Sequence, residues 1–443
     1  MASTKDILSA QRFNRARLMT AFQSGMPEGR ELTPTRPWGS LIAGLLITAL
    51  LFGGAWVSKL FVPSLPAGWE SGSLVTDDVT GARYVTIDGV LHPVRNAASA
   101  KLLHGQSLKV LSASTDTLSE APLGDPVGIA GAPDQIPAEQ AVADPSLVAC
   151  LSGDSQLRLG VSTGDAEIVD GAAAHVTSEG THYLIAGSYR YVLGDDEVSA
   201  QAILDTLNLN LDTAIAVPAS WLNVFDEGEP LTALTLDKFG ESVGPLEGID
   251  SDVLAGSILR VSDTANQGTA YVVTADGSIE RLSPVMESLY SIGDGAGAVE
   301  YSVTQRDIAQ LDLSVNTIRP TWPTEISTLV SEEQMPCALA SSQGSEETTA
   351  LALAPASDFG KNGVEVTPQG GAIVRRADST GRSLTYLIDE NGIWYPLSSP
   401  SETLGALGLG NADTLRVGAA WIDLYSTGPT LSVDAAWATV PGE

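Results

Sequence analysis

Histidine and cysteine are the side chains most often used for metal binding and for acid–base or thiol chemistry, and both are scarce in this sequence. There are four histidines and two cysteines in 443 residues. The histidines are His92, His104, His175 and His182, and no two of them have the i, i+4 spacing of a helical metal site. His92 falls in an expected hairpin, where we interpret it as a structural residue. The sequence therefore assigns no catalytic, cofactor-binding or metal site, and we expect no cofactor.

Motifs for phosphate binding and for nucleophilic catalysis are also missing from the sequence. It contains neither a GxxxxGK[ST] loop nor a GxSxG elbow, and Gly360-Lys361 lacks the surrounding residues of the first. The glycine-rich run 293–297 does not match GxGxxG and predicts a turn. Asp196 and Glu197 are expected at a helix N-terminus, where the positive end of the helix dipole stabilises carboxylates. We predict that the chain is not an enzyme.

The two cysteines are Cys150 and Cys337. In an oxidising compartment a disulfide between them is favoured, and by chain-entropy reasoning it would contribute about 4–5 kcal/mol to stability. Two separate buried thiols are the alternative. A zinc site would need further ligands at short spacing, and the sequence has none.

One apolar segment without charge runs from Trp38 to Ser58, and Lys59 follows it. About 20 apolar residues suffice to cross roughly 30 Å of hydrocarbon as a helix. Residues 1–38 hold six of the 23 basic and three of the 54 acidic residues, which leaves 17 basic and 51 acidic residues beyond. Because basic flanks stay in the cytoplasm, we predict a single-pass cell-membrane protein with a cytosolic tail, 1–38, a transmembrane helix, 39–60, and a large extracytoplasmic part. A cleaved signal peptide is the alternative, but its basic and apolar regions would both be too long.

The acidic surplus also limits the partners. A formal net charge of −31 repels the phosphate backbone, so we expect no nucleic-acid binding. A surface kept soluble by aspartate and glutamate accounts for the composition.

Four segments beyond the apolar stretch share a pattern of strand, glycine turn, second strand and helix. Their first strands begin at Tyr84, Tyr183, Tyr271 and Tyr386. Asp-Gly and Asn-Gly pairs between apolar runs are strong hairpin signals, because the turn needs positive φ. The second and fourth segments continue to match at an offset of 200 residues, as in Trp221 and Trp421. The sequence therefore predicts an internally duplicated domain with pseudo-two-fold symmetry.

These observations define a predicted organisation of the α+β class. A single N-terminal transmembrane helix precedes an elongated, β-rich extracytoplasmic domain, in which a central β body carries four small repeat units in a pseudo-two-fold arrangement. The repeat units are predicted at 71–124, 176–215, 256–315 and 371–415. The central β-rich domain is predicted to comprise 125–175, 216–255, 316–370 and 416–443. We expect the segment 341–357 to be a loop, because it shows no regular periodicity.

Three blocks of sequence resemble a known family. They are TKDILSAQRF at residues 4–13, the block from Tyr84 to Gly105 that contains DGVLHPVRN and SAKLLHG, and GIAGAPD at 128–134. Together they resemble EccB, the membrane-anchored core component of actinobacterial type VII (ESX) secretion systems. The resemblance covers essentially the full chain in the same order, including the apolar segment and the two cysteines.

The resemblance implies a structural subunit of the secretion core complex that supports protein export across the cell envelope. It implies as partners the FtsK/SpoIIIE-like ATPase EccC, the polytopic subunit EccD, the accessory subunit EccE and further copies of the chain itself. An ATPase activity has been proposed for the family, but no nucleotide-binding motif here supports it. A scaffold that binds peptidoglycan in the cell wall is the alternative function, and an anchored nucleotide hydrolase is a further one.

Overall fold

The computed structural model describes most of the chain in two compact units, Met1–Leu65 and Pro66–Glu443. The described residues are 3–25, 38–60, 65, 67–152, 156–164, 166–209, 214–249, 251–263, 267–315, 317–331, 333–341, 349–356, 363–377 and 383–438. The side chains of 24, 40, 54–60 and 377 are also outside the described set.

The first unit consists of two helices, α1 (Thr4–Ser24) and α2 (Trp38–Leu60). A capping box formed by Ser3 and Asp6 begins α1, and Gly25 ends it in the left-handed conformation. The sequence predicts a membrane-crossing helix at 39–60, and α2 occupies that segment. Within the described residues, however, no helix combines the length and the apolar character that a membrane span requires.

Four sheets of the second unit are each built from three antiparallel strands, a helix, and a strand that returns parallel to the first. The 73–113 sheet contains β1 (Ser73–Asp77), β2 (Arg83–Ile87), β3 (Val90–Pro93) and β4 (Lys109–Ala113), with helices α3 (Ala97–His104) and α4 (Thr115–Leu118) and the 3-10 helix η1 (Gly105–Ser107). The 172–227 sheet contains β7 (Ala172–Ser178), β8 (Thr181–Ala186), β9 (Tyr189–Val192), β10 (Ile215–Ala216) and β11 (Asp226–Glu227), with α5 (Glu197–Thr206) and α6 (Ala219–Leu222).

The other two sheets have the same order of elements. The 258–314 sheet contains β14 (Ile258–Val261), β15 (Ala270–Val273), β16 (Ile279–Arg281), β17 (Glu300–Val303) and β18 (Leu313–Ser314), with α7 (Pro284–Ser291), η4 (Asp294–Gly297) and α8 (Gln305–Ile308). The 372–416 sheet contains β23 (Ala372–Ala377), β24 (Ser383–Ile388), β25 (Trp394–Pro396) and β26 (Leu415–Arg416), with α9 (Pro400–Leu407), η5 (Ala419–Leu424) and α10 (Val433–Ala436). In every case the first strand precedes the predicted hairpin and the parallel strand follows the helix, so both lie outside the hairpin itself.

Local sequence explains the hairpins and most helix starts. Asp88 and Gly89 both have positive φ, 49° and 80°, as a two-residue Asp-Gly turn requires. Side chains of Asn96, Asp196 and Ser283 accept hydrogen bonds from backbone N–H groups and so begin α3, α5 and α7. The fourth helix differs, because Ser399 precedes α9 in the left-handed conformation and makes no side-chain cap.

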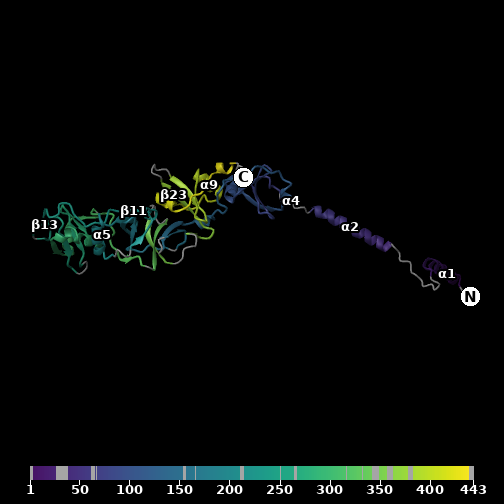
Figure 1. The fold of residues 1–443 in the computed structure, drawn as a ribbon, viewed down its shortest axis with the longest axis horizontal. Coiled ribbons are helices and arrows are strands. Elements are labelled where there is room, and N and C mark those ends of the chain that lie inside the picture. The colour runs from purple at the N-terminus through teal and green to yellow at the C-terminus, as the bar shows by residue number, and fades with distance from the viewer. Residues whose placement is uncertain are drawn as a thin grey trace. The chain divides into compact units, whose positions relative to one another are not determined.

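The sheets pack in two pairs through their helices. Helix α3 contacts α9, and Leu102 shares a buried cluster with Leu407 and Tyr395. Figure 1 shows α9 of the 372–416 sheet beside the early part of the second unit, far away in sequence. Helix α5 contacts α7 in the same way, through a cluster that includes Ile203 and Leu289. Burial of these apolar faces from water stabilises each pair.

The central sheet joins the two pairs. Its strands run in the order β21-β20-β5-β6-β22, with bounds β5 (Ser146–Leu151), β6 (Leu157–Val161), β20 (Gln334–Ser341), β21 (Thr349–Pro355) and β22 (Val364–Val366). The expectation of a loop at 341–357 is wrong for Thr349–Pro355, which forms β21. Alanine and leucine alternate in this strand and both of its faces are buried, so it lacks the alternation of polar and apolar residues that marks a half-exposed strand. The remaining elements are β12 (Ser242–Pro245), which pairs β13 (Asp252–Leu254), β19 (Thr328–Leu329), which pairs β7, and the 3-10 helix η2 (Glu139–Val142).

The Gly228→Ala substitution tests the close packing at the end of the 172–227 sheet. A Cβ atom at Gly228 would overlap Cε1 of Tyr191, a side chain only 1% exposed. We expect the free energy of unfolding to fall by about 1–3 kcal/mol, since the buried ring has little room to move. Urea unfolding of the full chain in detergent measures this. The Gly405→Ala variant is the control, because nothing lies within 4 Å of its added methyl group; equal losses in the two variants would contradict the prediction.

Candidate functional site

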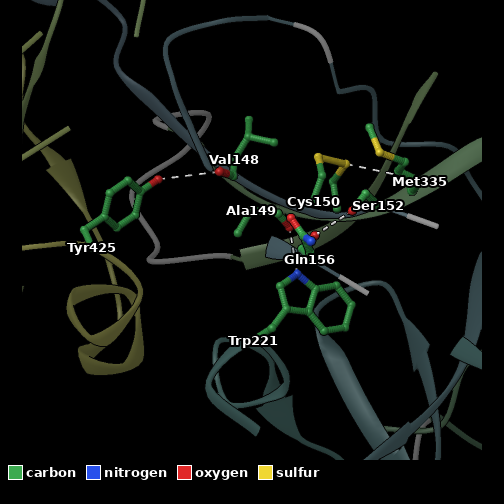
Figure 2. The surroundings of a disulfide bond; sticks show 9 residues. Val148, Ala149, Cys150, Ser152, Gln156, Trp221, Met335 and Tyr425 are labelled. Atoms are coloured by element: carbon green, nitrogen blue, oxygen red, sulfur yellow. Dashed lines mark hydrogen bonds between the residues drawn. A yellow bond between two sulfur atoms is a disulfide. The ribbon is translucent and has the colours of Figure 1, made fainter. Parts of the chain in front are cut away.

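The two cysteines meet at the middle of the central sheet. Strands β5 and β20 are antiparallel, and their register places Cys337 directly opposite Cys150. The two side chains form a disulfide across 187 residues of sequence, and both are fully buried. Figure 2 shows the bond and the residues around it. The link therefore joins two neighbouring strands of the central sheet that are far apart in the sequence.

The two faces of the central sheet are covered by different side chains. On one face Val148, Cys150, Met335 and Cys337 form a small buried cluster around the disulfide. On the other face the alternate residues of the same strands, including Ala149, pack into the largest hydrophobic cluster of the chain. This alternation follows from the two-residue period of a strand.

Two tryptophans form hydrogen bonds to strands of the central sheet from the side of this second face. Trp221 donates from Nε1 to the carbonyl oxygen of Ala149 at 2.7 Å, as Figure 2 shows. Trp421 donates from Nε1 to Oγ1 of Thr349 at 2.8 Å. Both indoles are completely buried, so each needs an acceptor inside the protein. These bonds hold the 172–227 and 372–416 sheets against the central sheet.

Tyr425 adds a third polar contact at this face. Its hydroxyl group donates to the carbonyl oxygens of Gly160, at 3.2 Å, and Val148, at 3.5 Å. Burial raises the pKa of Tyr425 above its usual range, so the phenol stays protonated and remains a donor. The three side chains around this sheet serve to position strands, and none presents a reactive group to solvent.

The structure brings together one pair of histidines that the spacing rule misses. His175 Nε2 lies 3.0 Å from His182 Nδ1, and the two rings are stacked. The residues sit on β7 and β8, where His182 pairs with Thr177. Glu179 and Gly180, both with positive φ, form the turn between the strands. Counting outward from that turn would have placed the two histidines on the same face.

The other histidines belong to the 73–113 sheet. His92 Nδ1 lies 2.8 Å from the carbonyl oxygen of Asp125. Burial lowers the pKa of His104 below its usual range, which favours the neutral ring. Within the described residues, no group of three or more His, Cys, Asp or Glu side chains is placed to hold a metal ion.

The acidic and glycine-rich segments have local structural roles. Asp196 accepts from the backbone N–H of Ser199 at 2.8 Å, and the hydrogen bonds from Ser199 lower the pKa of this carboxyl group. The predicted helix N-terminus at this position is therefore confirmed. The glycine-rich run contains the single 3-10 turn η4. Gly360-Lys361 lies outside the described residues.

The second unit is β-rich, with four similar sheets and a central sheet that contains a buried disulfide, and comparison with known proteins gives the family. The family described as "Type VII secretion system ESX-1, transport TM domain B" matches residues 1–441. The chain belongs to this family, EccB.

Curated relatives from Mycobacterium tuberculosis are similar over most of the chain. The protein named ESX-3 secretion system ATPase EccB3 is 26% identical, covering 89% of this chain and 81% of the relative. The protein named ESX-1 secretion system ATPase EccB1 is 24% identical, covering 90% of this chain and 86% of the relative.

Solved structures share the fold. A chain of the intact ESX-5 inner membrane complex matches with a TM-score of 0.63 and 19% identity, covering 100% of this chain and 96% of that chain. The EccB3 dimer from the ESX-3 core complex matches with a TM-score of 0.64 and 21% identity, covering 82% of this chain and 99% of that chain.

Replacing both cysteines tests the contribution of the cross-link. In the double variant Cys150→Ala, Cys337→Ala, we expect the free energy of unfolding to fall by about 2–5 kcal/mol, because the unfolded chain regains the freedom that the long closed loop removes. Urea unfolding of the full chain in detergent measures the change. As a control, a reductant during unfolding should lower the midpoint of the native chain and leave the variant unchanged. Equal midpoints for the two chains without reductant would contradict the prediction.

Proposed function

We propose that this chain is a structural, membrane-anchored subunit of a type VII secretion core complex. The observation that carries the proposal is the family match over residues 1–441. The likeness in fold to chains of ESX-5 and ESX-3 assemblies supports it. Protein export across the cell envelope would use the chain as a scaffold for other subunits.

The proposal includes a single membrane pass with the N-terminus in the cytoplasm. Residues 1–38 would form the cytosolic tail and 39–60 the anchor, while the rest would be extracytoplasmic. The uncharged run from Trp38 to Ser58 supports this assignment. So do the large apolar side chains that α2 exposes, such as Leu50, 74% exposed, and Phe52, 75% exposed. An extracytoplasmic position also suits a disulfide, since cytosolic thiols are kept reduced.

We further propose that the four sheets are copies of one repeat unit in a pseudo-two-fold arrangement. Their boundaries would be 71–124, 176–215, 256–315 and 371–415, around the central β-rich domain at 125–175, 216–255, 316–370 and 416–443. The tryptophan contacts support the duplication. Both the bond from Trp221 to Ala149 and the bond from Trp421 to Thr349 span 72 residues, so donors and acceptors alike are 200 residues apart.

The proposed partners are the FtsK/SpoIIIE-like ATPase EccC, the polytopic subunit EccD, the accessory subunit EccE and further copies of this chain. Self-association would take place through the extracytoplasmic domain. The solved relative described as an EccB3 dimer supports that part of the proposal.

We propose a structural role rather than an enzymatic one, although the curated relatives carry the word ATPase in their names. The buried carboxylates support this role because they accept hydrogen bonds from backbone N–H groups and so stabilise loops. Asp389, for example, accepts from the backbone N–H groups of Asn391 and Ile393, each at 2.9 Å. The sequence also lacks a phosphate-binding loop.

Purification of the tagged chain from mildly solubilised native membranes tests the scaffold function. We expect one high-mass complex that contains a large FtsK-like ATPase and a polytopic subunit, both identified by mass spectrometry. A tagged, unrelated single-pass protein purified in parallel is the control. Recovery of this chain alone from intact membranes would contradict the proposal and favour the peptidoglycan-binding alternative, which co-sedimentation with isolated cell wall would then test.

The structural role is tested separately by measuring ATP hydrolysis. We expect purified full-length chain in detergent to release phosphate from ATP no faster than a buffer control. The double cysteine variant serves as a matched preparation, because any contaminating ATPase should copurify with both chains. Turnover that follows the native chain through purification would contradict the structural role without affecting membership of the complex.

A further inference from the structure

The two cysteines of the central sheet have different neighbours. Arg158 of β6 lies directly opposite Cys150 and therefore on the same face of the sheet. Cys337 has Ala352 of β21 opposite it on its other side. Strands β20 and β21, with the sequences QMPCALAS and TALALAP, contain no charged residue. A cation therefore lies next to one cysteine and not next to the other.

Glu365 is the other charged side chain that the five strands place on the disulfide face. It belongs to β22 and lies opposite Gly160, which puts it two strands away from Cys150. Arg158 is on the adjacent strand, and it forms no ion pair with another described residue. Directly opposite residues have Cβ atoms about 4.5–5.5 Å apart. Arg158 is therefore the charged group of this sheet that acts most strongly on Cys150.

Burial of the disulfide limits when it can form. Both cysteines are 0% exposed, and Met335 and Ala166 pack in the cluster around them. An oxidant in solution cannot reach either sulfur atom in the folded chain. The bond must therefore form before this face of the sheet is covered, and the local structure at that stage decides which thiol reacts first.

The hairpin of β5 and β6 is the part of the central sheet that can form first, because a short turn joins its strands. Ser152 donates from its backbone N–H and from its hydroxyl group to the carbonyl oxygen of Gln156, each at 3.0 Å, and Figure 2 shows the second bond. A hairpin forms in about 1–10 μs, whereas pairing β20 with β5 must close a loop of 187 residues. Arg158 therefore lies opposite Cys150 before the second cysteine arrives.

A cation beside a thiol favours the thiolate, which is the form that attacks a disulfide bond. A neighbouring cation that raises the thiolate fraction about tenfold also lowers the nucleophilicity of the sulfur, so the net gain in rate is about threefold. This gain applies to Cys150 at neutral pH, where an ordinary thiol is mostly protonated. Cys337 has no cation opposite it on either neighbouring strand and lacks the gain.

We propose that Arg158 directs the oxidation of the central sheet by making Cys150 the first thiol to react with an oxidising disulfide. The Cys150 thiolate bonds to one sulfur of the oxidant, the S–S bond of the oxidant breaks, and the released thiolate takes up a proton. Cys337 then loses its proton, bonds to Sγ of Cys150 and releases the other half of the oxidant as a thiol.

The electrons balance in this sequence, because two cysteine thiols are oxidised to one disulfide while one disulfide is reduced to two thiols. Arg158 acts only through the charge of Cys150 and is a positioning residue. The proposal goes beyond the scaffold function and does not depend on it.

Two full-length chains, Cys337→Ala and Cys150→Ala, measure each thiol by itself, because each stops at the mixed disulfide. Each chain is reduced, unfolded in urea with detergent and diluted into buffer that contains excess glutathione disulfide, and mass spectrometry follows the added glutathione. At neutral pH we expect Arg158→Ala to slow the modification of Cys150 about threefold. The modification of Cys337 should be unchanged.

Three controls separate charge from general changes in folding. Arg158→Lys keeps the charge and should restore most of the rate at Cys150. Arg281→Ala removes an exposed arginine from β16, outside the central sheet, and should change neither rate. At about pH 10, where both thiols are ionised, and in chains kept unfolded in urea, where the hairpin is absent, Arg158→Ala should have no effect.

Unchanged modification of Cys150 in the Arg158→Ala chain at neutral pH would overturn the proposal. Equal slowing at both cysteines would also overturn it, since that result indicates a general change in refolding. So would an effect that persists at about pH 10 or that Arg158→Lys fails to rescue, because packing of the arginine side chain rather than its charge would then be responsible.

Discussion

The pairing of β5 with β20 is the contact on which the rest of the second unit depends. It joins segments that are 187 residues apart at the disulfide, and it is one of the two inner pairs of the central sheet. Closing so long a loop has a large entropic cost, which the covalent bond removes from folding once it has formed. Trp221 and Trp421, on the face opposite the disulfide, then donate hydrogen bonds to strands whose positions are already set.

The other four sheets are connected to the central sheet, or to one another, through packed helices and buried side chains. The 172–227 sheet packs on the 258–314 sheet through α5 and α7, and the 372–416 sheet packs on the 73–113 sheet through α9 and α3. Trp221 and Trp421 link one sheet of each pair to the centre. Most buried polar groups described above fasten strands and loops, as expected of a scaffold whose task is to hold partners in position. The indole nitrogens of Trp322 and Trp394 are exceptions, because neither has a hydrogen-bond partner among the described residues.

Much of the fold could be read from local signals. The Asp-Gly turn at Asp88, the caps at Asn96, Asp196 and Ser283, and the helix at Trp38–Leu60 all follow from residues close in sequence. Strand β21 could not be read in this way, because both of its faces are buried and its alternation is between alanine and leucine. The contact between His175 and His182 was missed because the i, i+4 rule applies to helices, whereas these residues lie diagonally on one face of a hairpin.

The sequence by itself determined the β-rich class, the hairpins, the match between the segments around Trp221 and Trp421 at an offset of 200 residues, and the family to which the chain belongs. These properties depend on short spacings or on matching motifs, which a single chain displays directly. Only the tertiary structure decided that Cys150 faces Cys337 and that each tryptophan donates into the central sheet. Such contacts join residues far apart in the chain, and their register depends on the packing of whole sheets rather than on any local pattern.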